Sequence, residues 1–171
     1  MITGQKTVLK GITKESASLI YEWVNTEELR DFTGTIYPVS EYEHEEWIKK
    51  TAVSTDKKIF LICDKESGTP IGTIGLKNFN QLIKKAELFI SIGNVNFLSH
   101  GYGTDAVNTL VKYCFEKLNL HKVSLRVYEK NVRAIKCYEK VGFCKEGLLK
   151  DEHFSNGKYE NVIVMGIVSR G

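Results

Sequence analysis

The chain has 171 residues, of which 42% are hydrophobic and 26% are charged, a composition typical of one globular domain spanning residues 1–171. Its formal net charge of +3 is too small to indicate a protein that binds nucleic acid or an anionic membrane surface. No apolar run approaches the roughly 20 residues that span a bilayer, and the N-terminal stretch MITGQKTVLKG lacks the apolar core of a signal peptide, so we expect a cytoplasmic protein without membrane partners.

The first predicted elements are a short strand and the helix that follows it. The strand spans Lys6 to Ile12. Thr13 is a suitable N-cap for a helix from Lys14 to about Val24, in which apolar residues recur at helical spacing. The next segment, Thr26 to Val39, contains a glycine and a proline and is predicted to be irregular.

A second helix is predicted from Ser40 to about Thr51. Ser40 followed by Glu43 has the capping-box pattern. The acidic residues after Ser40 favour the start of a helix through its dipole and do not indicate a metal site. Trp47 and Ile48 are the expected buried anchors. The four cysteines and four histidines of the chain show no metal-ligand spacing, so no metal is expected.

Three strands are predicted next, at Lys58 to Asp64, Thr69 to Asn78 and Ala86 to Ile92. The turn Glu66-Ser67-Gly68-Thr69 joins the first two as a hairpin. The third strand leads into a glycine-rich stretch, which we expect to connect it directly to a long helix.

The stretch from Phe97 to Leu118, FLSHGYGTDAVNTLVKYCFEKL, predicts a turn that opens into an amphipathic helix. Gly101 and Gly103 stand where the helix begins, so backbone N–H groups can approach a ligand without a Cβ atom in the way. The unpaired N–H groups of the first turn and the helix dipole together favour a phosphate group there. An ordinary strand–turn–helix connection explains the same pattern equally well.

The C-terminal part predicts a strand, a short helix and a hairpin. The strand spans Lys122 to Tyr128, the helix spans Asn131 to Lys140 and ends at Gly142, and the hairpin spans Phe143 to Val168 with an Asn-Gly turn. The order of elements, β-α-α-β-β-β-α-β-α-β-β, predicts an α+β fold with one mixed sheet and helices on its faces.

The predicted short helix carries a second informative pattern. Asn131, Ala134 and Tyr138 are spaced so that they share one helix face. A small residue between two polar ones leaves room for an extended ligand. A plain amphipathic helix with Asn131 as its N-cap is the alternative explanation.

Several segments together resemble the GNAT superfamily of acetyl-CoA-dependent N-acetyltransferases, and most closely its branch of ribosomal-protein N-terminal acetyltransferases (RimJ/RimL type). The resemblance is densest from Ala86 to Ile167, and the matching segments are AELFISIG, HGYGTDAV, LNLHKVSLRVYEKNVRAIKCYEKVGF and EGLLKDEHFSNGKYENVIVMGI. It implies a GNAT-like fold, with a mostly antiparallel sheet, one splayed parallel strand pair and helices on both faces. It also implies that acetyl-CoA is the acetyl-donating cosubstrate.

The resemblance assigns the pyrophosphate loop to Leu98 to Gly103, where this sequence departs from the family. Leu98 stands where the family usually has glutamine or arginine, and Ser99 where a glycine is common. His100 is either an added phosphate contact or an exposed loop residue. The cofactor-binding residues that the resemblance implies are Ile90, Ser91, Ile92, Leu98, Ser99, His100, Gly101, Tyr102, Gly103, Thr104, Asn131, Ala134 and Tyr138.

The resemblance also implies direct acetyl transfer without a covalent enzyme intermediate. Backbone N–H groups near Ile90 are expected to stabilise the oxyanion, and Tyr138 to protonate the leaving thiolate. Glu87 is the candidate general base, with a structural or solvent-facing glutamate as the alternative. The residues expected to bind the acceptor are Arg30, Phe32, Tyr37 and Glu87.

Three classes of amine acceptor are compatible with the sequence: a protein N-terminus, which the branch resemblance favours, a polyamine, or a small amino metabolite. The acceptor is expected between Thr26 to Val39 and Asp151 to Tyr159, in a monomer or homodimer. A non-catalytic acyl-CoA-binding regulatory protein is the rival reading. The departures at Leu98 and Ser99 leave room for it, whereas the intact Asn131 and Tyr138 oppose it. The absence of G-x-G-x-x-G and G-K-[ST] patterns weighs against a dinucleotide or kinase loop.

Overall fold

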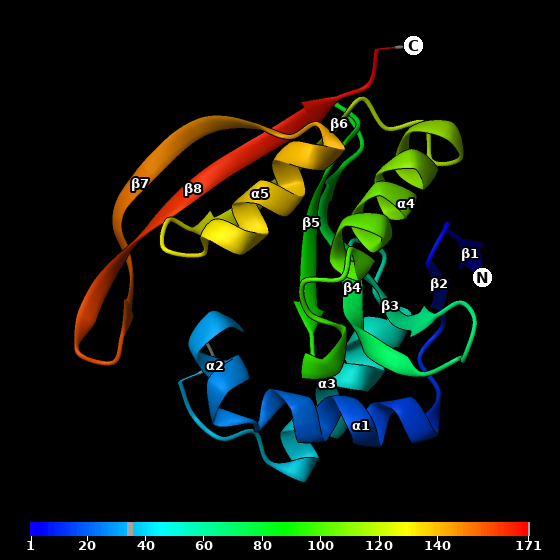
Figure 1. Ribbon diagram of the computed structural model, residues 1–171, viewed down its shortest axis with the longest axis vertical. Coiled ribbons are helices and arrows are strands. Elements are labelled where there is room, and N and C mark those ends of the chain that lie inside the picture. Colours follow the sequence, from blue (N-terminus) through cyan, green and yellow to red (C-terminus); the bar gives the residue numbers. More distant parts are fainter. Residues whose placement is uncertain (34–35, 171) are drawn as a thin grey trace.

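The computed structural model describes residues 1–33 and 36–170, without the side chains of residues 31–33. In this part of the chain the strands form one eight-stranded sheet in the order β1-β2-β3-β4-β5-β6-β8-β7 (Figure 1). The strands are β1 (Ile2–Thr3), β2 (Thr7–Lys10), β3 (Lys58–Asp64), β4 (Pro70–Asn80), β5 (Lys85–Ile92), β6 (Lys122–Tyr128), β7 (Cys144–Ser155) and β8 (Lys158–Val168).

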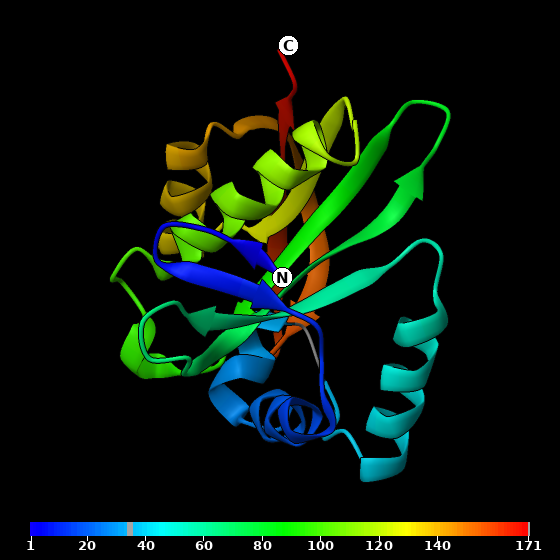
Figure 2. The ribbon, with the colours of Figure 1, turned by 90° about the vertical axis from the view of Figure 1, so that its right-hand side faces the viewer.

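Helices cover both faces of this sheet, as the sequence predicts. They are α1 (Lys14–Val24), α2 (Glu27–Thr33), α3 (Glu41–Val53), α4 (Tyr102–Glu116) and α5 (Val132–Val141), with a 3₁₀ turn, η1, at Val95–Phe97. Figure 2 shows α3 and α4 on opposite sides of the central strands. Residues 71–76 of β4 are all buried, which requires cover on both faces of that strand. No described helix has the length and apolarity to cross a membrane.

The centre of the sheet contains one parallel strand pair that separates part-way along. β5 and β6 are in register only at Lys85–Lys122, Ala86–Val123 and Glu87–Ser124, and the other strand pairs of the described sheet are antiparallel. Beyond Glu87, β5 keeps β4 as its partner, while β6 keeps β8. The predicted mixed sheet with a splayed parallel pair is therefore confirmed.

The helix starts at Thr13 and Ser40 and the final hairpin turn lie where the sequence predicts them. Thr13 caps α1 and Ser40 forms a capping box with Glu43 at the start of α3, as predicted, and Thr13 also forms a capping box with Ser16. Asn156 and Gly157 both have positive φ angles in the turn between β7 and β8, which matches the Asn-Gly hairpin turn that the sequence predicts. The first predicted strand is shorter than expected, at Thr7–Lys10, and it pairs with β1, which the sequence reading missed.

The prediction that Thr26 to Val39 is irregular is wrong for its first half, which forms α2. The amides of Leu29 and Arg30 both donate to the Thr26 carbonyl, and two glutamates occupy the first turn, where they favour the positive end of the helix dipole. A seven-residue helix is too short to display a clear apolar period. The glycine at position 34 lies outside the described residues.

The anchors predicted for α3 also need correction. Trp47 and Ile48 are only half-buried, whereas His44 is buried and its Nε2 lies 2.7 Å from the Ala17 carbonyl oxygen. The His44 ring also stacks on Trp47, with 5.8 Å between ring centroids. A hydrogen bond to α1 therefore lets a polar side chain take the inner position on α3.

The start of α4 is fixed by an aspartate that reaches the N-terminal hairpin. The Asp105 carboxylate accepts hydrogen bonds from the amides of Gln5, Lys6 and Thr7 and from the Thr7 hydroxyl, at 2.7 to 3.2 Å. Lys6 then donates from Nζ to the His100 carbonyl at 2.8 Å. The N-terminal strands thus hold the glycine-rich loop in place from the side away from α5.

We expect Asp105→Ala to lower the free energy of unfolding by about 2 to 4 kcal/mol, because the part-buried amide and hydroxyl of Thr7 and the exposed amide of Lys6 lose their charged acceptor together. Urea denaturation measures the change. Glu116→Ala at the other end of α4 is the matched control, since its exposed pair with Lys112 at 3.9 Å contributes below about 0.5 kcal/mol. Equal destabilisation by both variants would contradict the anchoring role.

Candidate active site

A cavity of about 1180 Å³ opens where β5 and β6 separate. Its walls come from β5 beyond Glu87, the loop before α4, the cavity-facing side of α5, the first turn of α2 and the outer part of β7. Figure 1 shows α2 and the β7–β8 hairpin on one side of the strands and the start of α4 on the other. The volume exceeds the roughly 300 to 1,000 Å³ of a site for one drug-sized ligand, so two ligands can meet inside it.

The loop before α4 presents backbone N–H groups to this cavity. Ser99 and Gly101 have positive φ angles of 62° and 85°, and no side chain caps the first turn of α4 in the described structure. Leu98, Ser99, Gly101, Gly103 and Thr104 line the cavity. The first N–H groups of the helix and its dipole therefore face open space that suits a phosphate.

Two residues of this loop lie elsewhere. His100 is exposed and is not part of the cavity lining, which agrees with its alternative as a loop residue. Tyr102 packs edge-on against Phe97 with 5.0 Å between centroids and lies under the Lys6 ammonium, also off the lining. Both side chains shape the outer side of the loop and do not face the cavity.

The free edge of β5 forms the cavity wall opposite this loop. Ile90 pairs with Ile74 of β4 on one edge, while the other edge of β5 has no strand partner after Glu87 among the residues described. Alternate backbone groups of a strand point to opposite edges. Some N–H and C=O groups between Leu88 and Ile92 are thus left for a ligand, and Ile90, Ser91 and Ile92 all line the cavity.

Helix α5 brings Asn131, Ala134 and Tyr138 to the same cavity. The Asn131 Oδ1 accepts a hydrogen bond from the Ala134 amide at 3.3 Å, so the asparagine does cap its own helix. The Thr104 hydroxyl donates to Cys137 Sγ at 3.2 Å and joins the first turn of α4 to the middle of α5. The loop and α5 therefore hold a fixed relative position across the cavity.

Tyr138 lies deep in this wall, with only 7% of its surface exposed and its ring edge-on to Phe143 at 6.0 Å. Burial raises the pKa of Tyr138 well above its usual range, and the neighbouring Cys137 thiol adds to the shift. The hydroxyl has no protein hydrogen-bond partner in the described structure. A protonated phenol without a partner on a cavity wall can donate its proton to a ligand atom.

Glu87 does not line the cavity, although the sequence suggested it as base and acceptor-binding residue. Its carboxylate lies between Lys77 Nζ, at 3.2 Å, and Arg126 Nε, at 3.8 Å, with 17% of the side chain exposed. Lys77 is its direct cross-strand neighbour on β4. This geometry favours the structural alternative, in which Glu87 neutralises and orients two cations at the point where the strands separate.

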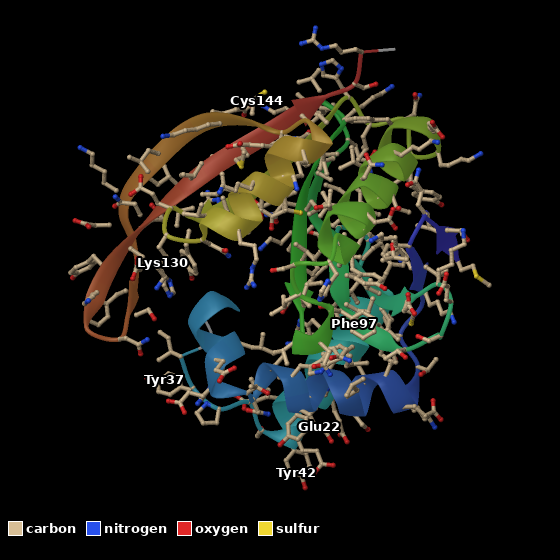
Figure 3. The ribbon with its side chains drawn as sticks, viewed as in Figure 1. Glu22, Tyr37, Tyr42, Phe97, Lys130 and Cys144 are labelled. Carbon is tan, nitrogen blue, oxygen red and sulfur yellow. The ribbon has the colours of Figure 1, made fainter. Side chains whose placement is uncertain are left out.

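Of the other acceptor-binding candidates, Arg30 and Tyr37 are not brought to the cavity either. Arg30 is half-buried off the lining, and Tyr37 is 79% exposed and points outward, as Figure 3 shows. The Phe32 side chain lies outside the described residues. Glu28 and Leu29 of α2 line the cavity instead.

The outer part of β7 supplies Glu152 and His153 to the same side of the cavity. A bulge before His153, with Asp151 at a φ of 51°, turns this part of the strand. The His153 ring lies 5.3 Å from the Tyr128 ring, and Glu152 lies 4.0 Å from Arg126. The sequence predicted that the segment from Asp151 to Tyr159 would contact the acceptor. It did not predict the position of the bulge, which decides which side chains face the cavity.

Comparisons with known proteins agree on one family. A family model described as an acetyltransferase (GNAT) domain matches residues 6–144. The spermidine N(1)-acetyltransferase of Vibrio cholerae is 33% identical over 74% of this chain and 72% of its own length. The putative ribosomal N-acetyltransferase YdaF of Bacillus subtilis is 30% identical over 60% of this chain and 56% of its own length.

A solved structure is similar over nearly the whole chain. The crystal structure of spermidine N-acetyltransferase from Vibrio cholerae, in complex with CoA and spermine, superposes with a TM-score of 0.87 and 28% identity. The match covers 95% of each chain. It therefore includes the strands and helices that surround the cavity.

Gly103→Val tests whether the loop receives the cofactor. A Cβ atom at this position meets no protein atom within 4 Å, so we expect little change in the melting temperature of the ligand-free protein. CoA at 100 times its dissociation constant should stabilise the wild type by about 2.7 kcal/mol, and the side chain should remove most of that stabilisation by projecting toward the phosphate. Thermal melts with and without CoA measure both quantities. An unchanged CoA shift in the variant would place the phosphate elsewhere.

Proposed function

The chain belongs to the GNAT acetyltransferase family, and on this premise we propose that its acceptor is a polyamine such as spermidine. It transfers an acetyl group from acetyl-CoA to a primary amine. The observation that carries the proposal is the pair of carboxylates, Glu28 and Glu152, on the cavity wall away from the phosphate loop. They come from α2 and β7, elements far apart in the sequence.

The charges around these carboxylates leave them available for a cation. Arg126 is shared between Glu87 at 3.8 Å and Glu152 at 4.0 Å, and Lys77 is paired with Glu87 at 3.2 Å. Glu28 has no ion-pair partner in the described structure. A polyamine carries several ammonium groups joined by methylene segments, so it suits a cavity lined by separated carboxylates and by apolar residues such as Leu29.

The comparisons favour the same acceptor over a protein N-terminus. The spermidine acetyltransferases match a larger share of this chain, at higher identity, than the ribosomal N-acetyltransferase YdaF. The similar solved structure has spermine as a second ligand beside CoA. A cavity large enough for two ligands is consistent with that arrangement.

The residues present fit acetyl-CoA. The exposed N–H groups at the start of α4 suit its pyrophosphate, and the unpaired edge of β5 suits the amides of its pantetheine arm. When bound, acetyl-CoA supplies a thioester as the acetyl donor. The proposed placement brings the thioester to the gap between β5 and β6, next to Tyr138.

Two groups of the chain then act on the reaction. Backbone N–H groups of β5 near Ile90 donate hydrogen bonds to the oxyanion that develops as the amine attacks. Tyr138 donates its hydroxyl proton to the sulfur as the carbon–sulfur bond breaks and the carbon–nitrogen bond forms. The nitrogen gives up its own proton to water or to a lining group, since Glu87 lies off the cavity.

Tyr138→Phe should lower kcat by about 10²- to 10⁴-fold, because it keeps the buried ring and removes the proton donor. The KM for acetyl-CoA should change little. Because burial raises the pKa of Tyr138, its phenol stays protonated across neutral and mildly alkaline pH, so the wild-type rate should not fall through tyrosine ionisation below about pH 10. Steady-state kinetics from pH 6 to 9 measure both effects, with Tyr113→Phe on α4 as the control. A Tyr138→Phe enzyme with wild-type kcat would exclude the role.

Glu28→Gln and Glu152→Gln should each raise the KM for spermidine by about 5-fold, since each removes a partly exposed charge partner of an ammonium group. The KM for acetyl-CoA should stay unchanged. Glu27→Gln is the matched control, because Glu27 is next to Glu28 on α2 but does not line the cavity. The same assays should give a higher kcat/KM for spermidine than for a peptide with a free N-terminus. A preference for the peptide would overturn the polyamine proposal.

A further inference from the structure

The phosphate loop of this chain lacks a cation of its own. Leu98 is apolar at a position where the family resemblance implies glutamine or arginine, and loop residues 98–104 contain no lysine or arginine. Lys6 reaches the loop only from outside, where its ammonium donates to the His100 carbonyl and lies off the cavity lining. The pyrophosphate therefore meets backbone N–H groups there but no countercharge from the loop.

Helix α5 presents cations to the cavity beside that loop. Arg133, Lys136 and Lys140 all line the cavity and are exposed. The bond between the Thr104 hydroxyl and Cys137 Sγ fixes this part of α5 against the first turn of α4. Arg133 lies nearest the loop, with its Nη1 3.5 Å from Ser99 Oγ.

These three cations are not neutralised by the protein. None of them lies within 4.0 Å of a carboxylate in the described part of the chain, in contrast to Lys77 and Arg126 on the acceptor side. The other unpaired lining cation, Lys57, lies over the Trp47 and Phe89 rings. The α5 cations also face the positive end of the α4 dipole. This side of the cavity therefore concentrates uncompensated positive charge, which a polyanion would relieve.

We propose that Arg133 binds the pyrophosphate of CoA and replaces the cation missing at Leu98, while Lys136 and Lys140 extend the positive field along α5. The proposal rests on the acetyl-CoA site described above, but not on the identity of the amine acceptor. An arginine opposite a helix N-terminus can hold a phosphate in two-point hydrogen bonds while the helix N–H groups hold it from the other side. The missing loop cation is thus supplied by a different element of the fold.

The test is calorimetric titration of CoA and dephospho-CoA into the wild type, Arg133→Gln, Arg133→Lys and Arg170→Gln. Arg170 is exposed at the far end of the chain, so its variant changes the net charge equally without touching the cavity. Arg133→Gln should weaken both ligands by about 10-fold, Arg133→Lys should restore part of the affinity, and Arg170→Gln should bind as the wild type does. Melting of the ligand-free proteins checks that each variant is folded.

The salt dependence of CoA binding distinguishes a direct charge contact of Arg133 from an indirect structural effect of its substitution. The dissociation constant of the wild type should rise with added KCl, and that dependence should be weaker in Arg133→Gln because one screened contact is gone. Wild-type affinity in Arg133→Gln, or an unchanged salt dependence, would overturn the proposal. A loss confined to CoA would assign Arg133 to the 3′-phosphate and overturn the pyrophosphate contact. Failure of spermidine as an acceptor would refute the proposed function and leave this result standing.

Discussion

The site depends on the separation of two neighbouring strands in the middle of a sheet. Parallel strands normally satisfy each other's backbone groups along their whole length, but β5 and β6 do so for only three residue pairs. Each keeps a full antiparallel partner on its other side, so the separation does not unravel the sheet. The edge of β5 left open beyond Glu87 is a set of donors and acceptors already held in extended geometry. A ligand with its own amide groups can complete the sheet there at little cost in conformational entropy.

Charge is divided between the two sides of this gap. On the side of β6 and β7, Glu87 and Glu152 lie near Arg126, so that its charge is compensated within the protein. On the side of α5, Arg133, Lys136 and Lys140 have no carboxylate within 4.0 Å in the described structure. The N-terminal end of the α4 dipole adds positive potential on the same side. A ligand with an anionic end and a neutral reactive end is therefore oriented before it makes its specific contacts.

The sequence predicted those features of the fold and the site that arise from local interactions. Thr13, Ser40 and Asn156 act within a few residues of chain, and the helix starts and the final turn lie where these residues indicated. The open edge of β5 followed from the family resemblance and not from any residue pattern. Features that depend on packing between distant segments were missed. The inner position of His44 requires the Ala17 carbonyl of another helix, and the place of Glu87 off the cavity requires Lys77 and Arg126 from two other strands.

The side of α2 that faces the cavity could not be predicted for a related reason. A helix of one or two turns carries little periodic signal, so Arg30 and Glu28 were equally plausible until the position of α2 relative to β7 was known. The same limit applies to β7, where the bulge before His153 changes which side chains turn inward.

The hydrogen bonds of Asp105 also bear on how the protein acquires its shape. They join residues 98 to 100 positions apart, and the aspartate stands at the start of the helix that presents the phosphate loop. During synthesis the first hairpin leaves the ribosome long before its acceptor does, so it must wait unpaired for more than half the chain. Such distant contacts raise the contact order and slow folding. The contacts that hold the cofactor loop can therefore form only when the amino end of the chain meets a residue made about 100 positions later.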